Sequence, residues 1–471
     1  MNSELYRIEE DSIGKIKIPK EAYYGSQSLR AKDNFNITGQ KLYSELIISM
    51  AEIKKAAAIT NMEIGDLNSK IGNAIVKACD EIILGKFHDQ FIVDPIQGGA
   101  GTSTNMNTNE VIANIALELI GEEKGNYKII NPNDHVNMGQ STNDVYPSGG
   151  KMTVLKLIIK AISKLEDLES ALLKKSVEFS DVIKMGRTQL EDAVPITLGQ
   201  EFNAYSSAIK RDIRRFTLAM NEMQVLNLGG TAIGTGLNAD VNYVKNIVPN
   251  LSKISGLNLT QAEDLIDNTQ NLDSYVMVSG VIKSCAVSLS KISNDLRLMN
   301  SGPRTGFGEI NLPPKQNGSS IMPGKVNPVI PEVVNQVAFN IVGNDVTITM
   351  AAEAGQLELN AFEPILFYKL FDSLNTLING ITTFIDNCIV DIVANRKESR
   401  RLVDHSIGMI TAINPYVGYD RAAKIAQEAL KTGKSIRELI LRDELIPESE
   451  IDDILDPFKM LKPGVIGKDS R

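Results

Sequence analysis

The sequence predicts a mainly α-helical fold organised around a long helical bundle. Of the 471 residues, 43% are hydrophobic and 23% are charged, which is typical of a globular protein with a large core. Apolar residues recur every three or four positions over several segments of about 25 residues or more. Helices of this length cannot bury so wide an apolar face alone, so we expect them to pack on one another and on neighbouring subunits.

The pattern of a buried helical seam is clearest over residues 151–179. Its apolar residues are spaced 4, 3, 4, 3 and 4 positions apart: Val154, Ile158, Ala161, Leu165, Leu168 and Leu172. Similar patterns predict long helices over residues 200–224, 275–299, 332–354 and 361–392. The third of these begins just after Pro331. In the last, Pro364 and Gly380 predict a kink or a short break.

The regions on either side of the bundle differ from it in kind. Residues 1–140 mix short helices with Gly/Asn/Thr-rich loops and short β-like runs such as Ile16–Ile18. From about residue 395 the helices are short, and Ser435 with Glu438 has the pattern of a capping box. We therefore predict three domains: a mixed N-terminal domain with active-site loops (1–140), a central long-helix bundle (141–395) and a small helical C-terminal domain (396–471).

The charge distribution excludes several classes of partner. The net charge is -9 with a pI near 5.2, and no run of Lys and Arg stands out, so we expect no nucleic-acid partner. The first 20 residues are polar and charged, and no charge-free apolar stretch of about 18 residues appears, so we expect a cytoplasmic protein without a membrane span. The three cysteines lie in apolar segments and are expected to be buried thiols.

Small polar residues gather in four segments that interrupt the helical pattern: 98–107, 131–144, 186–190 and 318–328. Their Gly, Ser, Thr and Asn residues supply hydroxyl, amide and backbone N–H groups, which are neutral donors suited to carboxylate oxygens. Taken singly, each segment is also consistent with an ordinary connecting loop rich in caps and turns. Loops at the ends of bundle helices can converge, so four of them together predict a site for a small anionic substrate.

Other chemistries do not fit the sequence. The segment 318–328 imitates a phosphate-binding loop, but five residues separate Gly318 from Gly324 and Val326 follows the lysine. No serine lies in a Gly-x-Ser-x-Gly elbow. The only histidines are too scattered for a metal centre: His88, His135 and His405. A serine–histidine pair remains open, although His135 in its Asn/Asp-rich segment is more consistent with a structural role.

The segment 318–328 also carries a family resemblance. It reads Gly-Ser-Ser-Ile-Met-Pro-Gly-Lys-Val-Asn-Pro, which resembles the signature of the fumarase/aspartase superfamily. The resemblance continues through residues 97–103, 131–137, 186–190 and 350–357 and covers essentially the whole chain. Within the superfamily, the chain is similar to the aspartate ammonia-lyases. These enzymes eliminate ammonia from L-aspartate to give fumarate.

The resemblance implies a fumarase/aspartase-type fold with a central bundle of five long helices. It also implies a homotetramer in which four bundles form a core of twenty helices and three subunits contribute to each active site. No organic cofactor is implied, because the substrate's own carboxylate delocalises the electrons. Activation by Mg²⁺ is an expectation from the resemblance, and the sequence offers no recognisable site for it.

Carried over by position, the resemblance assigns a role to ten residues of this chain. Ser319 is the expected general base that removes the C3 proton. Four residues are expected to hold the β-carboxylate: Thr102, Ser141, Thr142 and Ser320. Lys325 and Asn327 are expected to hold the α-carboxylate. Three further residues are expected near the α-carboxylate or the amino group: Asn143, Thr188 and Gln189.

The chemistry explains why such residues are needed. Removal of the C3 proton places two negative charges on the β-carboxylate as an aci-carboxylate, so the rate depends on donors already aimed at its oxygens. A serine is a weak base unless its oxygen is stabilised as an anion. Successive N–H groups of the Gly-Ser-Ser loop and the charge of Lys325 can provide this. We hypothesise that the loop closes over substrate, with Gly318 and Gly324 as hinges.

The leaving group separates the two leading enzymatic interpretations. Ammonia leaves the protonated amine without help, whereas a hydratase needs an acid to protonate the departing hydroxide. Fumarases of this superfamily carry histidine at the positions of Gln189 and Asn131, neither of which titrates here. A fumarase-type hydratase is therefore the weaker alternative, although some ammonia-lyases also keep the first histidine. Argininosuccinate- and adenylosuccinate-type lyases differ around residues 97–107 and 186–190.

A non-enzymatic alternative is a superfamily member kept as a structural protein, as lens crystallins are. It predicts eroded polar segments around an intact bundle. Ser319, Lys325 and Asn327 are all present, which disfavours it.

Overall fold

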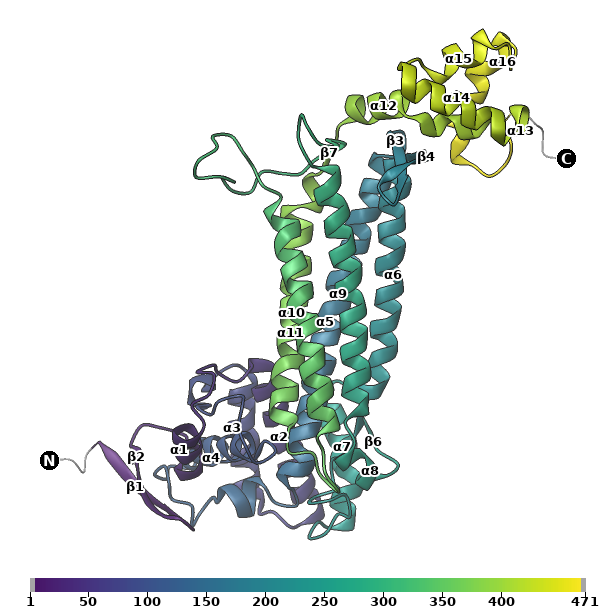
Figure 1. Cartoon of the computed structure of the whole chain (residues 1–471). Coiled ribbons are helices and arrows are strands. Elements are labelled where there is room, and N and C mark those ends of the chain that lie inside the picture. The colour runs from purple at the N-terminus through teal and green to yellow at the C-terminus, as the bar shows by residue number, and fades with distance from the viewer. Residues whose placement is uncertain (1–4, 467–471) are drawn as a thin grey trace. The chain divides into compact units, whose positions relative to one another are not determined.

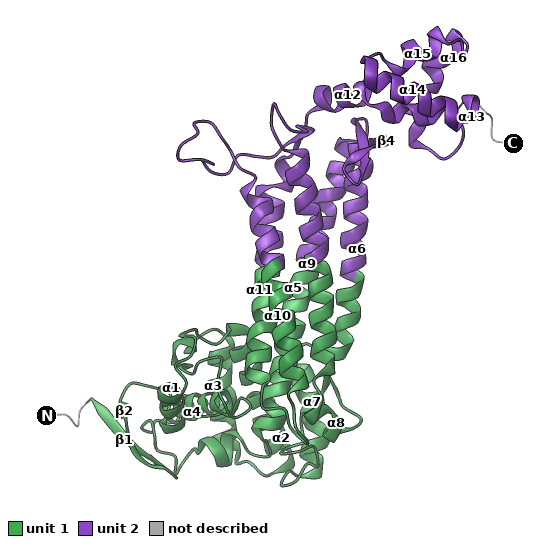
Figure 2. Cartoon of the chain, in the orientation of Figure 1, with its two compact units in different colours: residues 1–162, 214–286, 339–378 green, residues 163–213, 287–338, 379–471 purple. Residues whose placement is uncertain are grey.

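The computed structural model describes residues 5–466, and these divide into two compact units. Unit 1 comprises residues 1–162, 214–286 and 339–378, and unit 2 comprises residues 163–213, 287–338 and 379–471 (Figure 2). Each unit therefore draws on three separate stretches of the chain. The domain boundaries near residues 140 and 395 were placed from the sequence composition rather than from contacts in the structure, and they stay predictions.

The N-terminal part of unit 1 consists of a hairpin and four helices. Strands β1 (Tyr6–Asp11) and β2 (Gly14–Pro19) pair antiparallel, which confirms the β-like run at Ile16–Ile18. The helices are α1 (Ser26–Asn34), α2 (Ser44–Ile64), α3 (Ser69–Ile83) and α4 (Thr102–Leu119). Buried residues of α2, α3 and α4 form one hydrophobic cluster. The segment Pro132–Val136 is a single π-helical turn.

Five long helices lie side by side (Figure 1). They are α5 (Thr142–Glu178), α6 (Leu198–Met223), α9 (Asp273–Met299), α10 (Val329–Glu353) and α11 (Glu363–Asn387). All six predicted seam residues of α5 are fully buried. Of the kink or short break predicted in α11, the break was wrong, because one helix runs from Glu363 to Asn387. Pro364 is the second residue of the helix, where a missing N–H costs nothing, and the helix continues through Gly380.

Side-chain contacts between these helices are both aromatic and polar. In unit 1, the Phe367 ring lies 5.2 Å from the rings of Tyr146 and Tyr275, measured between centroids. In unit 2, the Tyr205 hydroxyl donates to Asp295 Oδ2 at 2.9 Å. Helix α9 is long and apolar enough to cross a membrane by length and composition. Its buried residues nevertheless recur at helical spacing, as expected of a core helix in a bundle: Tyr275, Val278, Ile282, Cys285, Leu289, Ile292 and Leu296.

Short elements connect the long helices. Strands β3 (Ile183–Thr188) and β4 (Glu191–Thr197) form an antiparallel hairpin. Strands β5 (Val225–Leu226) and β6 (Thr260–Gln261) pair parallel, and β7 (Ile310–Asn311) pairs antiparallel with β8 (Val393–Ala394). Helices α7 (Val241–Ser255) and α8 (Leu265–Gln270) belong to unit 1. Short 3-10 turns cover His88–Gln90, Ile389–Asp391, Ile407–Ile413 and Lys459–Leu461.

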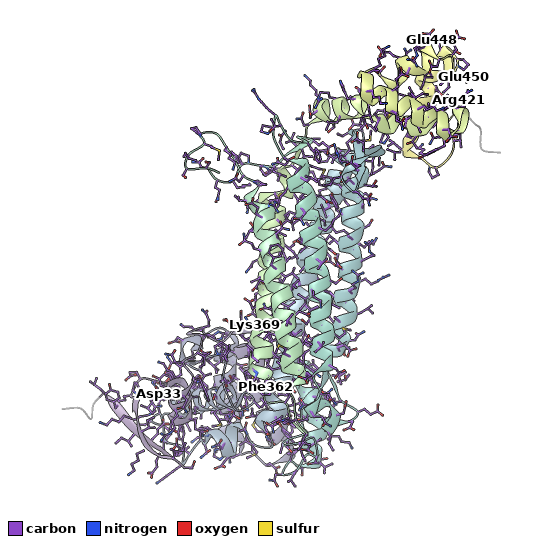
Figure 3. The ribbon with its side chains drawn as sticks, in the orientation of Figure 1. Asp33, Phe362, Lys369, Arg421, Glu448 and Glu450 are labelled. Carbon is purple, nitrogen blue, oxygen red and sulfur yellow. The ribbon has the colours of Figure 1, made fainter. Side chains whose placement is uncertain are left out.

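The C-terminal part of unit 2 contains five short helices. They are α12 (Arg396–His405), α13 (Asn414–Val417), α14 (Tyr419–Thr432), α15 (Ile436–Arg442) and α16 (Glu448–Ile454). The predicted capping box is confirmed, because Ser435 and Glu438 bond each other's backbone N–H at the start of α15. Glu448 and Glu450 lie in the first turn of α16 (Figure 3), where negative charge interacts favourably with the helix dipole and stabilises the helix. The three cysteines are buried free thiols, as expected.

Candidate active site

The ten predicted site residues fall into two sets. Unit 1 holds Thr102, Ser141, Thr142 and Asn143, whereas unit 2 holds Thr188, Gln189, Ser319, Ser320, Lys325 and Asn327. Within each unit, the local geometry shows which groups of these side chains are free to meet a ligand.

The expectation that residues 98–107 form a loop was only partly right. The loop ends at Gly101, and Thr102 is the first residue of α4. Gly101 has a φ of 88°, and a Cβ there would lie 2.3 Å from the Tyr146 ring, so only glycine fits. Thr102 is exposed at this helix N-terminus, but its N–H already donates to Gly99 O at 3.0 Å and that of Thr104 to Gln97 Oε1 at 3.0 Å. The Thr102 hydroxyl donates to Gly99 O at 2.7 Å and must rotate before it can donate to a ligand.

The second predicted segment also ends in a helix N-terminus. Ser141 N donates to Asp144 Oδ1 at 2.9 Å, and Asn143 N donates to Ser141 Oγ at 3.2 Å. These two bonds form a reciprocal cap on α5. Ser141 Oγ accepts in this cap, so its own proton stays available to a ligand. The Asn143 amide, by contrast, already donates to Ala232 O at 2.8 Å.

Thr142 links the starts of α4 and α5. Its Oγ1 accepts a hydrogen bond from Asn105 Nδ2 at 3.0 Å. A threonine hydroxyl has one proton, so an oxygen that accepts from Asn105 keeps that proton for another partner. The structure therefore brings Thr142 and Ser141 together with the first turns of α4. Both hydroxyls have a proton free for a carboxylate.

Behind these residues lies a buried pair of charged side chains that the sequence reasoning missed. The side chains of Lys54 and Asp144 are both fully buried. Burial raises the pKa of Asp144 to about 6, although its hydrogen bonds from Ser141 N, Gly229 N and Thr231 N and the charge of Lys54 lower it. Burial lowers the pKa of Lys54 to about 7, and Asp144 opposes that shift. One signal was available, because Lys54 follows Ile47 and Ala51 at helical spacing on the apolar face of α2.

In unit 2, residues 186–190 are not an irregular loop but form the end of β3 and the turn of a β-hairpin. Thr188 is the last residue of β3, and Gln189 and Leu190 form a two-residue turn with φ values of 57° and 68°. Such a turn normally carries Asn or Gly, because a side chain strains this backbone. Thr188 and Gln189 are both exposed at the hairpin tip.

The strand that leads to this tip is anchored by a buried carboxylate. Arg187 Nη1 donates to Glu309 Oε1 at 2.9 Å, and Lys184 Nζ lies 3.5 Å from Glu309 Oε2. Glu309 is fully buried. The Arg187 guanidinium also lies over the Phe307 ring, 4.1 Å from its centroid. The sequence pattern gave no reason to pair these residues, which are separated by more than 100 positions in the chain.

The segment 318–328 is a loop with a closed base. Gly318 N donates to Lys325 O at 3.0 Å, and Asn327 Nδ2 donates to Gly318 O at 2.6 Å. Inside the loop, Ser319 Oγ accepts hydrogen bonds from Ile321 N at 3.2 Å and Met322 N at 2.8 Å. Successive N–H groups thus face the serine oxygen. Ser320 and Lys325 are exposed on the same loop.

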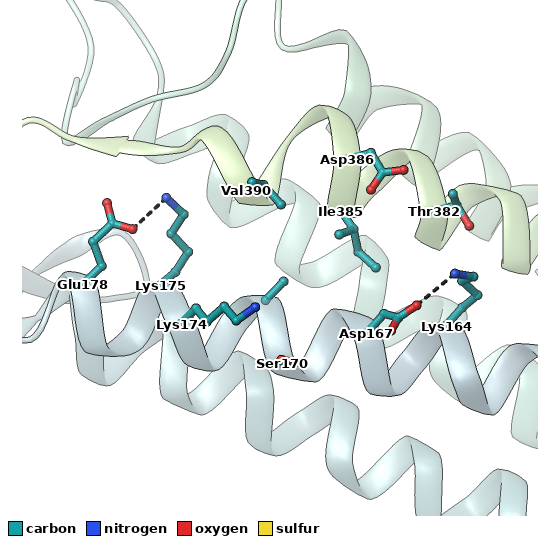
Figure 4. A pocket seen from close by; sticks show the side chains of 11 residues that line it. Lys164, Asp167, Ser170, Lys174, Lys175, Glu178, Thr382, Ile385, Asp386 and Val390 are labelled. Atoms are coloured by element: carbon teal, nitrogen blue, oxygen red, sulfur yellow. Dashed lines mark hydrogen bonds and ion pairs between the residues drawn. The ribbon is translucent and has the colours of Figure 1, made fainter.

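Three other features of the described residues offer no alternative site: possible metal clusters, His135 and one cavity. Between residues 5 and 466, no group of three or more His, Cys, Asp or Glu side chains could hold a metal ion. His135 Nδ1 accepts from Asn131 N at 2.9 Å, which is a structural role. A cavity of about 450 Å³ in unit 2 lies between α5 and α11 (Figure 4). Its charged groups largely pair with each other, as in Lys164–Asp167 and Lys175–Glu178, and no predicted site residue lines it.

Comparison with known proteins identifies the class. Residues 14–343 match the family model described as lyase, and residues 409–462 match the model of the fumarase C C-terminus. The chain belongs to the lyase family, within the fumarase/aspartase superfamily.

The particular relatives agree over nearly the full length. Aspartate ammonia-lyase of Bacillus subtilis is 54% identical over 98% of both chains, and that of Escherichia coli is 48% identical over 98% of this chain and 97% of its own. A Brucella melitensis structure described as a fumarate lyase:delta crystallin superposes with a TM-score of 0.95 at 47% identity, covering 97% of this chain and all of that one. A class II fumarase from Schistosoma mansoni superposes at 0.93 with 36% identity, covering 97% and 99%. The resemblance and the predicted mainly helical fold are confirmed.

Proposed function

We propose that this protein is an aspartate ammonia-lyase, a carbon–nitrogen lyase that reversibly eliminates ammonia from L-aspartate to give fumarate. The observation that carries the proposal is the near-complete match to aspartate ammonia-lyases at about half identity. The structure adds threonine hydroxyls at the first residues of two helices, Thr102 and Thr142, as donors suited to a carboxylate. Gln189 and Asn131 are consistent with a leaving group that needs no acid.

In this proposal, Ser319 is the general base. It takes the C3 proton while Thr102, Ser141, Thr142 and Ser320 hold the β-carboxylate. The C2–N bond then breaks as the electron pair of the aci-carboxylate forms the C2–C3 double bond, and its own electron pair leaves with the amine as neutral ammonia. The free protons of Ser141 and Thr142 support this assignment, because a hydroxyl must donate to stabilise the second negative charge.

The remaining contacts hold the other end of the substrate. Lys325 and Asn327 bind the α-carboxylate, with Asn143, Thr188 and Gln189 near that group or the amino group. One Asn327 N–H is committed to Gly318 O, so its other N–H is the one left for substrate. The strained turn at Gln189 supports a functional role for the hairpin tip, since such strain is retained mainly where function requires it.

We further propose a homotetramer in which active sites are shared between subunits. An exposed apolar stripe along α10 supports it: Phe339, Val342, Val346 and Met350 are between 40% and 67% exposed. These residues recur at helical spacing, and a stripe of this kind on a bundle helix needs a partner. A second copy of the chain is the natural occupant, because the resemblance implies a core of twenty helices.

The proposal has three further parts. The reaction requires no organic cofactor, because the β-carboxylate itself accepts the electrons. Activation by Mg²⁺ is expected from the resemblance, but the described residues offer no cluster for the ion, and no step uses it. The proposed location is the cytoplasm.

A fumarase-type hydratase is the second candidate, favoured by the shared fold of the class II fumarase. The two are separated by following fumarate absorbance after addition of L-aspartate and, separately, of L-malate. We expect fumarate and an equal amount of ammonia from L-aspartate only. Activity on L-malate alone would overturn the proposal, and inactivity on both would favour the non-enzymatic alternative.

A further inference from the structure

A buried hydrogen-bond chain runs from Lys54 to the proposed β-carboxylate site. Lys54 Nζ donates to Asn137 Oδ1 at 2.8 Å and to Gln140 Oε1 at 3.0 Å. The same Asn137 oxygen accepts from Asn105 Nδ2 at 3.2 Å. Asn105 Nδ2 in turn donates to Thr142 Oγ1 at 3.0 Å. Each side chain in this chain is buried or half-buried in unit 1.

We propose that Lys54 is a positioning residue for the elimination: through Asn137 and Asn105 it fixes the direction in which the Thr142 hydroxyl donates. The proposal rests on the proposed function and deepens it. Lys54 does not touch the substrate. It acts through two amides to keep the Thr142 proton pointed at the β-carboxylate.

The direction of the chain follows from what each group can do. An ammonium group only donates, so it holds the oxygen of Asn137 toward itself. Asn137 Nδ2 points the other way and donates to Gln140 O at 3.1 Å. Asn105 must then present its nitrogen to Asn137, and its second N–H reaches Thr142. An accepting Thr142 oxygen leaves its proton free.

Two unpaired oxygens support this direction. Asn105 Oδ1 and Asn109 Oδ1 are buried and have no hydrogen-bond partner among the described residues. Both amides nevertheless turn their nitrogens to Asn137 Oδ1, at 3.2 and 3.3 Å. Leaving a buried oxygen unpaired is unfavourable, so a stronger interaction must hold both amides this way. The Lys54 cation on the shared oxygen is that interaction.

Burial lowers the pKa of Lys54, and the charge of Asp144 of α5 opposes that shift by favouring the protonated form. Burial raises the pKa of Tyr243 of α7, and the charge of Asp144 adds to that shift. Asp144 caps Ser141 by its hydrogen bond from Ser141 N. The buried pair therefore supports both neighbouring hydroxyls of the proposed site.

A double-mutant cycle tests the proposal. Steady-state kinetics with L-aspartate are measured for the wild type, Lys54→Met, Thr142→Val and the double variant, along with inhibition by succinate. We expect Thr142→Val to lower kcat by roughly 100-fold, the loss typical of one oxyanion donor. We expect Lys54→Met to lower kcat by about 10-fold with a smaller change in succinate inhibition, because the donor matters most to the doubly charged intermediate. The double variant should be no worse than Thr142→Val.

A purely structural lysine would give another result. Lys151 is the matched control: it is 3% exposed in the same unit, and its Nζ bonds Val225 O at 2.7 Å and Asn268 Oδ1 at 3.0 Å. Any loss in Lys151→Met should multiply with that of Thr142→Val. Multiplying losses for Lys54→Met, or an unchanged kcat, would overturn the positioning role. If the wild type fails to convert L-aspartate, the proposed function falls and the inference with it.

Lys54→Met could fail to fold, because it removes the buried cation whose charge favours the ionised form of the buried Asp144. In that case, Asn105→Leu tests the same chain while keeping the buried pair. It should lower kcat, and its loss should again not add to that of Thr142→Val. Additive losses would show that Asn105 does not act through Thr142.

Discussion

Ser319 Oγ lies 2.8 Å from Met322 N and accepts its hydrogen bond, while Ile321 N donates to the same oxygen at 3.2 Å. Two N–H groups on one hydroxyl oxygen stabilise that oxygen when it carries negative charge. This arrangement is what a serine base requires. It exists within the loop itself, before any substrate contributes.

The first prediction concerns Ser319. Ser319→Ala should lower kcat by roughly 10²–10⁴-fold, which is what a general base typically contributes. Exchange of the C3 proton of L-aspartate with deuterated water should fall in parallel, whereas succinate should still bind. Ser170→Ala, in the cavity of Figure 4, is the control and should leave turnover unchanged. Continued C3 exchange in Ser319→Ala would assign the base elsewhere.

The second prediction concerns the base of the loop. A Cβ at Gly318 would lie 2.5 Å from Lys325 O and 2.6 Å from Asn327 N, so Gly318→Ala must open the closed base. Gly324 has a φ of 79° but open space around it, so Gly324→Ala meets only backbone strain of about 1 kcal/mol. Measured kcat should therefore fall more for Gly318→Ala than for Gly324→Ala. The reverse order would contradict this account of the loop.

The third prediction concerns Glu309, which lies between Lys184 and Arg187. Glu309→Gln leaves the Arg187 guanidinium without its buried carboxylate, while Lys184 keeps Glu201 Oε2 at 3.0 Å, and should lower the free energy of unfolding by about 3 kcal/mol. The hairpin tip should loosen as well, raising KM for L-aspartate. Urea denaturation and kinetics measure the two effects. Glu191→Gln, an exposed change on the same hairpin, should alter neither measurement.

The fourth prediction concerns pH. Burial raises the pKa of Glu110 to about 7 from its ordinary 4.5, despite hydrogen bonds from Ser28 Oγ, Gln27 N and Gly25 N. An acid with a raised folded-state pKa binds its proton more tightly when folded. Its contribution is therefore largest below pH 4.5 and is lost as the pH rises to about 7. The stability of the wild type relative to Glu110→Gln should fall by up to about 3 kcal/mol across this range.

Denaturation of both proteins at several pH values measures that difference. A constant difference between pH 4.5 and 7 would show that folding does not shift the pKa of Glu110.

The fifth prediction concerns assembly. Val346→Asp places a charge in the exposed stripe of α10, where Val346 is 57% exposed. If a second copy covers this stripe, the variant should dissociate and lose activity together, because the proposed sites are shared between subunits. Sedimentation velocity measures the change. Leu84→Asp, at an isolated exposed position after α3, is the control and should leave the assembly intact. An intact, active Val346→Asp oligomer would place the interface elsewhere.

The sequence alone determined the mainly helical fold, the five long helices and the buried seam of α5. These follow from apolar spacing, which depends only on the helical period. It also determined the family, because the segment 318–328 and its companions are long and specific. It could not show that residues 102–107 and 142–144 are helical. Small polar residues favour loops locally, and burial of Asn105, Asn107 and Asp144 against other elements overrides that preference.

Only the tertiary structure decided which polar groups meet. Lys54 and Thr142 lie 88 positions apart in the chain, and the direction of donation between them depends on two amides from other segments. The same holds for Arg187 and Glu309. Hydrogen bonds and ion pairs act over a few ångströms, and sequence separation carries no information about such distances. The sequence pointed to the residues expected to touch the substrate, and the fold supplied those that hold them in place.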